Sequence, residues 1–179
     1  RSSSADQDPR WRWRTIETDH FRVHYYEGLE RIARRIATIA EHAHEDLSEE
    51  LGWEPRRITH LVVFDNTDYA QGITYVGAQN RIELWVVAPD SESTLEDFED
   101  WLTLLVTHEY THLVHIDQAR GLPVLINAIF GQVYHPMQFT PTWLTEGYAV
   151  HEESTQTTGG RVRSSMFDMY LRMAVLEDE

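Results

Sequence analysis

Three residues in the middle of the chain have the types and the spacing of a metal-binding motif. His108, Glu109 and His112 form the pattern H-E-x-x-H within the stretch from Trp101 to Asp117. The apolar residues of this stretch recur at helical spacing, so we expect a largely buried helix. Residues four apart share one face of a helix, which lets two neutral imidazoles bind a single ion. The motif therefore predicts a metal site on a buried helix.

Glu109 would lie beside that ion without having to bind it. A zinc ion lowers the pKa of a bound water to about 7, and a neighbouring carboxylate can accept the proton and return it. The short pattern can arise by chance in a chain with 10 histidines. Its apolar context argues against chance, because unpaired polar side chains are costly to bury. The expected chemistry is hydrolysis with Glu109 as the general base.

A zinc site of this kind needs a third protein ligand, and Glu146 is the best candidate. The spacing found in metzincins is excluded, because His115 would have to be Gly and Gln118 would have to be His. Glu146 lies in a second helical pattern that begins at Pro141, a residue suited to the first turn of a helix. An apolar side that would pack this helix against the first is formed by Trp143, Leu144, Tyr148 and Val150.

With Glu146 as the third ligand, the two helices resemble those of the gluzincin metallopeptidases. Among gluzincins, the likeness is to the aminopeptidase N branch, whose third-ligand helix carries a W-L-x-E-G-x-A pattern. The resemblance implies that His108, His112 and Glu146 bind one zinc ion per chain and that Glu109 is the general base. It also implies that Glu153, seven residues after Glu146, orients a ligand imidazole.

The chain departs from aminopeptidase N in two places. Residues 113–145 make a longer connection between the zinc helices, and no G-x-M-E-N sequence precedes the first of them. Aminopeptidase activity is therefore not implied. The chain more closely resembles the bacterial peptidase MA-like domains, which often precede a TolB-like β-propeller. This likeness implies a peptide or protein substrate, a periplasmic or secreted location, and a β-propeller elsewhere in the full-length protein.

The sequence leaves open which residue stabilises the oxyanion that forms when water attacks a carbonyl group. The candidates near the cleft are Tyr110, Tyr134, His135 and Tyr148. His115 lies on roughly the same helix face as His108, so it either supports the site or is an ordinary core histidine. In the second case Asp117, at the end of the helix, would bond to it.

The remaining segments predict an α+β, zincin-like fold, in which a small mixed sheet covers the H-E-x-x-H helix and a mostly helical half follows. Alternating or apolar runs predict strands at residues 20–26, 59–64, 72–76 and 81–87, the last two as a hairpin, and residues 28–51 form an amphipathic helix. We expect residues 81–87 to be the sheet edge that lines the substrate cleft. Residues 90–100 are expected to cap the H-E-x-x-H helix.

Other features have two interpretations each. Residues 121–140 form either a mobile lid or docking surface or, as we favour, an ordinary buried helix. Trp11 and Trp13 are expected to cover the core from an edge segment rather than to bind a ligand. His20 and His24 could bind a metal, but we favour solvated histidines on the wetter face of a strand. His42 and His44 are interpreted as surface residues.

Composition limits the classes of partner. The formal net charge is −15, and all 15 basic residues are Arg, which argues against binding to nucleic acid or an anionic membrane surface. Cysteine is absent, so thiolate ligands and disulfides are excluded. The longest apolar run, residues 122–130, is too short for a transmembrane segment. We expect residues 1–12 to be flexible and residues 13–179 to be a single domain of a longer protein.

Two other functions remain open. The chain could be a catalytically silent zinc-binding interaction domain that presents its lid surface to a partner, or it could hydrolyse a non-peptide substrate at the same metal site. A catalytic zinc site keeps one coordination position open for water, whereas a structural site closes with four protein ligands.

Overall fold

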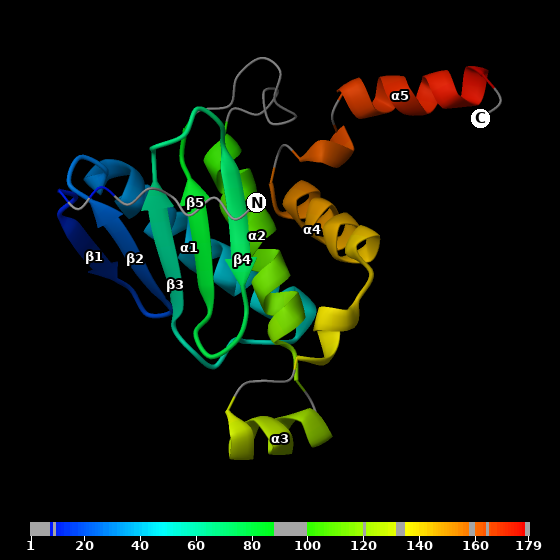
Figure 1. The fold of residues 1–179 in the computed structure, drawn as a ribbon. Coiled ribbons are helices and arrows are strands. Elements are labelled where there is room, and N and C mark those ends of the chain that lie inside the picture. The colour runs from blue at the N-terminus through cyan, green and yellow to red at the C-terminus, as the bar shows by residue number, and fades with distance from the viewer. Residues whose placement is uncertain are drawn as a thin grey trace.

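The computed structural model describes residues 8, 10–87, 100–119, 121–131, 135–157, 160–163 and 165–177. These residues form a five-stranded mixed sheet and five α-helices, which confirms the α+β class (Figure 1). The elements are β1 (Trp13–Glu17), β2 (Phe21–Tyr26), α1 (Glu30–Leu51), β3 (Thr59–Phe64), β4 (Gln71–Tyr75), β5 (Arg81–Trp85), α2 (Trp101–Asp117), α3 (Leu122–Phe130), α4 (Thr142–Gln156) and α5 (Ser165–Leu176). Two 3-10 turns, η1 (Pro136–Phe139) and η2 (Arg161–Arg163), flank α4.

The sheet has the strand order β1-β2-β3-β5-β4. Strands β2, β3 and β5 are parallel, whereas β1 and β4 run antiparallel to their neighbours at the two edges. The expected hairpin is present, but the expectation that residues 81–87 form the edge was wrong, because β5 pairs with β3 and β4. Burial explains the order: β5 places Ile82, Leu84 and Trp85 in the interior, while β4 is only half-buried.

Helices α1 and α2 cover one face of the sheet, and the main core lies between them and the strands (Figure 1). Helix α1 buries its apolar stripe and ends at Gly52, whose φ of 57° is the left-handed conformation that glycine adopts readily. Helix α2 spans the expected residues, and most of its side chains are buried. The Asp100 side chain caps it by accepting a hydrogen bond from the Thr103 amide at 3.3 Å. The rest of the predicted cap, residues 90–99, lies outside the described residues.

Helix α4 lies beside α2, whereas α3 and α5 extend away from the sheet and α2 (Figure 1). The interpretation of α3 as a buried helix was wrong: Leu122, Leu125, Ile129 and Phe130 are 62–75% exposed. The apolar side assigned to α4 is also misplaced. Trp143 and Leu144 are exposed, and the helix instead buries Ala149, Glu152, Glu153 and Ser154. In the part of the chain that is described, no helix is long and apolar enough to cross a membrane.

The N-terminal half supports one sequence interpretation and corrects another. Trp11 stacks on Tyr26 with ring centroids 4.5 Å apart, as expected of an edge segment that covers the core. His42 is exposed as expected, but His44 is 5% exposed and its Nδ1 lies 2.6 Å from the Tyr110 hydroxyl. The interpretation of His44 as a surface residue was wrong because this side of α1 faces α2. His24 and His60 also contact each other, with Nε2 and Nδ1 2.9 Å apart.

Candidate metal centre

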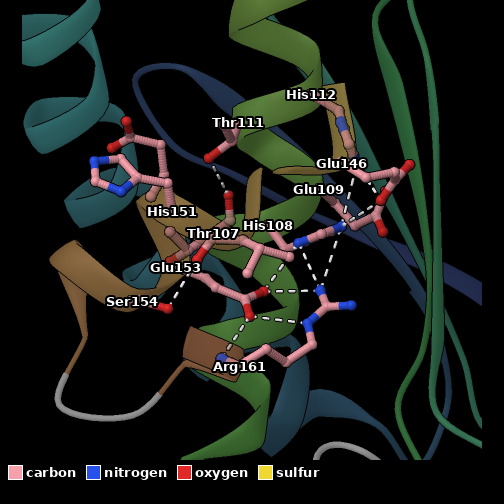
Figure 2. A network of polar contacts seen from close by, with 12 residues as sticks. Thr107, His108, Glu109, Thr111, His112, Glu146, His151, Glu153, Ser154 and Arg161 are labelled. Atoms are coloured by element: carbon pink, nitrogen blue, oxygen red, sulfur yellow. Dashed lines mark hydrogen bonds and ion pairs between the residues drawn. The ribbon is translucent and has the colours of Figure 1, made fainter. Parts of the chain in front are cut away.

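The structure brings the three predicted ligands together from two helices (Figure 2). The Nε2 atoms of His108 and His112, on α2, lie 3.1 Å apart. Oε2 of Glu146, on α4, lies 3.5 Å from the first and 3.6 Å from the second. Atoms bound to a tetrahedral zinc ion at about 2.1 Å are separated by about 3.4 Å, so these spacings suit such an ion.

The electrostatic surroundings suit a cation. Burial, and then the neighbouring His108, lower the pKa of His112 to about 4, so its imidazole is neutral and able to bind an ion at physiological pH. The two histidines are buried, whereas the side chain of Glu146 is 52% exposed. The site is therefore open to solvent on the α4 side.

Glu153 occupies the position expected of a residue that orients a ligand. Its Oε2 lies 2.9 Å from Nδ1 of His108, on the opposite side of the ring from the Nε2 atom that faces Glu146. A proton on Nδ1 that bonds to this carboxylate leaves the Nε2 lone pair for an ion. Glu153 is 1% exposed. Burial acts to raise its pKa, but hydrogen bonds from Arg161 and His108 outweigh burial and lower the pKa to about 2.

Arg161, on η2, is a site residue that sequence reasoning missed. Its Nε lies 2.9 Å from Oε1 of Glu153 and its Nη2 lies 2.8 Å from Oε2, a two-point ion pair. The same Nη2 lies 2.8 Å from Nδ1 and 3.5 Å from Nε2 of His108. Figure 2 shows the guanidinium directed toward His108, with Glu109 and Glu146 beyond it. Gly160, with φ of 96°, sets this turn against Ser154, where a Cβ would overlap the serine.

Glu109 is held against the edge strand. The Thr74 hydroxyl on β4 lies 2.8 Å from Oε2 of Glu109 and 2.9 Å from its backbone oxygen. A Cβ on Gly72 would overlap the Glu109 side chain in its present position, so a larger residue there would displace the carboxylate. Burial raises the pKa of Glu109, and the opposing effects of His108 and Thr74 are smaller. Raising the pKa of a carboxylate makes it a stronger base.

The sequence candidates for the oxyanion donor are dispersed. The Tyr110 hydroxyl bonds to His44 in the core. The ring of Tyr148 packs edge-on against His115, and burial raises its pKa to about 12. His135 is buried beside a cavity shared with Asp117 and Trp53, and neither of its ring nitrogens has a partner among the described residues. Tyr134 lies outside the described residues.

His115 does not make the bond considered for it. Its Nδ1 is buried without a hydrogen-bond partner in the described part of the chain, and burial lowers its pKa. Asp117 instead accepts hydrogen bonds from Trp53 at 3.1 Å and Asn80 at 3.4 Å. His115 and Tyr148 therefore form a separate aromatic contact between α2 and α4.

Comparisons of the chain with protein-family models, with curated proteins and with solved structures gave no match. The geometry of the site provides two buried imidazoles, one half-exposed carboxylate, and a second carboxylate that is buried against the edge strand.

Proposed function

We propose that this domain is a zinc-dependent peptidase of the gluzincin type, in which His108, His112 and Glu146 bind one ion. The observation that carries the proposal is the convergence of their Nε2, Nε2 and Oε2 atoms, with separations of 3.1–3.6 Å. Two nitrogen ligands and one carboxylate leave the fourth position of a tetrahedral ion for water or substrate. The ion would supply Lewis acidity and a water that ionises near neutral pH.

Glu109 acts as the general base. It follows His108 on α2, so its carboxylate lies beside the ligand set without joining it. The Thr74 hydroxyl lies 2.8 Å from Oε2 and holds the carboxylate that would accept the proton of the attacking water. The raised pKa of Glu109, caused by burial, also helps it to return the proton to the leaving amine. Thr74 and Gly72 are positioning residues for this base.

Arg161 is the group best placed to stabilise the oxyanion. Its Nη2 lies 3.5 Å from the ligating Nε2 of His108, whereas the tyrosine candidates Tyr110 and Tyr148 are bonded or packed elsewhere. When Nδ1 of His108 carries the proton that Glu153 accepts, it can no longer accept a bond from Arg161. The N–H of Nη2 that does not bond to Glu153 is then available to the negative charge that develops on a carbonyl oxygen.

Strand β4 supports a peptide as the substrate. It is a sheet edge that pairs only with β5 among the described strands, and its Thr74 holds Glu109. An extended peptide can add to such an edge through backbone hydrogen bonds. A peptide bound along β4 would therefore lie next to the catalytic carboxylate. This assigns to β4 the role first expected of residues 81–87.

A second function, that of a catalytically silent zinc-binding interaction domain, has one observation in its favour. Helices α3 and α5 expose large apolar side chains, among them Leu125, Ile129, Leu171 and Val175. Surfaces of this kind are typical of protein contacts. They are compatible with either function, because a peptidase domain within a longer protein also needs docking surfaces.

The two functions differ in what Glu109→Gln does. For a peptidase, this variant loses turnover by at least about a hundredfold while binding as much zinc as the wild type. Glu49→Gln, an exposed replacement on α1, is the matched control and keeps full activity. A zinc-loaded wild type that cleaves no peptide would support the interaction domain instead.

A further inference from the structure

A second group of metal-ligating side chains lies in the N-terminal half of the chain. His20 precedes β2, His44 belongs to α1, and Glu54 lies in the connection between α1 and β3. One ligand atom from each of the three lies within 4.8 Å of the others. Among the described residues, the only other such group is the catalytic set, His108, His112 and Glu146.

The two imidazoles are held as metal ligands usually are. Nδ1 of His20 lies 2.6 Å from Oε2 of Glu41, and Nδ1 of His44 lies 2.6 Å from the Tyr110 hydroxyl. A ligating histidine typically donates its second ring N–H to an oxygen, which fixes the tautomer and leaves a lone pair on the other nitrogen. Both rings therefore have Nε2 left for an ion.

The carboxylate of Glu54 lies close to His44 but not within hydrogen-bond distance of it. Nε2 of His44 lies 3.9 Å from Oε1 of Glu54, which is beyond hydrogen-bond range. The side chain of Glu54 is 69% exposed, so the carboxylate is free to approach. An ion bonded to both atoms at about 2.1 Å would bridge this distance with only a small shift.

The rings of His20 and His44 are stacked, with centroids 3.7 Å apart and planes 18° from parallel. Parallel rings do not direct two lone pairs at one point, so one ring must tilt when an ion binds. His20 is the ring with room to tilt, because its side chain is 37% exposed and that of His44 is 6% exposed. His20 and Glu54 line the same open cleft, which gives an ion access from solvent.

We infer that His20, His44 and Glu54 form a second metal site, separate from the catalytic one, for a divalent transition-metal ion such as zinc. Two imidazoles and a carboxylate favour this class over calcium or magnesium, which take oxygen ligands. The ion joins the turn before β2, the middle of α1 and the connection after it. The site is a structural clamp on the half of the fold that carries the sheet.

The test is the number of zinc ions bound per full chain after equilibrium dialysis, measured by elemental analysis. Glu54→Gln removes an exposed ligand without disturbing the core, and His20→Gln removes a second. His42→Gln, an exposed histidine two residues from His44, is the matched control. Each variant is also made with His112→Ala, which disables the catalytic site.

The wild type and His42→Gln should bind two zinc ions, whereas Glu54→Gln, His20→Gln and His112→Ala each bind one. Glu54→Gln combined with His112→Ala should bind none. If the second site existed but the catalytic site did not bind zinc, the wild type would bind one ion and Glu54→Gln would bind none. The second site is overturned if Glu54→Gln and His20→Gln keep the wild-type zinc content, or if His112→Ala alone abolishes binding.

Discussion

The Thr74 hydroxyl lies 2.8 Å from Oε2 of Glu109, and this contact joins the edge strand of the sheet to the helix that carries the two candidate histidine ligands. Gly72, two residues earlier on β4, has no side chain to separate strand and helix at this point. The position of Glu109, the proposed general base, therefore depends on a residue that lies 35 positions earlier in the chain. Changes in β4 should affect catalysis without affecting metal binding.

Replacement of Gly72 by Ala tests this relationship. The added Cβ would overlap Glu109, so the carboxylate must move and turnover should fall by about a hundredfold. Zinc content should stay at the wild-type value because no ligand is touched. Gly77→Ala, where the added Cβ meets open space, is the matched control and should keep wild-type turnover. Equal activities of the two variants would contradict the assignment of Gly72 as a positioning residue.

Glu153 predicts a pH-dependent contribution to stability. Because its pKa falls from 4.5 to about 2 on folding, the ionised carboxylate stabilises the fold fully above pH 4.5, and this contribution is lost as pH falls toward 2. Glu153→Gln should lower the free energy of unfolding by about 3 kcal/mol at pH 7. Urea titrations in the presence of a chelator should show this difference shrinking between pH 4.5 and 2.

The neighbouring Glu152 is the control for that experiment. It is equally buried, but burial, and then the nearby Glu50, raise its pKa. Its contribution therefore has the opposite sign: the wild type loses stability relative to Glu152→Gln as pH rises above 4.5. If both variants showed the same pH dependence, the hydrogen bonds from Arg161 and His108 would not be the cause of the effect at Glu153.

Arg161 is predicted to act on the chemical step. Arg161→Ala should reduce kcat by about 10²- to 10³-fold with a smaller change in KM, as loss of an oxyanion donor does. Arg161→Lys keeps the charge but not the two-point contact with Glu153, so it should restore part of the activity. Arg163→Lys, on the same turn, is the control. A change confined to KM would place Arg161 in substrate binding rather than in oxyanion stabilisation.

Strand β4 should become protected when a peptide-like inhibitor binds. Hydrogen exchange of residues 71–75 should slow, because backbone bonds to the inhibitor add to an edge that was open. Residues 13–17, which form the opposite edge of the sheet, should exchange at an unchanged rate. Protection limited to α3 or α5 would indicate that peptides bind at the exposed apolar surface instead.

The spacing of apolar residues and the H-E-x-x-H motif predicted the helices that carry the candidate metal ligands. Helix α2 has the expected bounds because its apolar run is long and Asp100 provides a cap. The family resemblance pointed to Glu146 and Glu153 on α4, and the structure places Glu146 near Nε2 of His108 and Glu153 against Nδ1 of the same ring. In each case the information lies within a single helix.

Strand order and contacts between distant elements could not be predicted from the sequence in the same way. The hairpin of β4 and β5 has the same sequence pattern whichever strand is at the edge, so the order followed only from the burial of Ile82 and Leu84. Arg161 carries no local signal, because its role depends on a turn that returns η2 to α4. His44 looked exposed because its partner, Tyr110, lies 66 residues away.

The proposal of a zinc-dependent peptidase is tested by measuring zinc content together with cleavage of a quenched fluorescent peptide library. Both measurements are made on Glu54→Gln, which lacks the second site, and on the double variant Glu54→Gln with Glu146→Ala. We expect one zinc ion and chelator-sensitive cleavage in the first protein, and loss of both in the second. Zinc bound with unchanged affinity after Glu146→Ala, or cleavage that persists without zinc, would contradict the proposal.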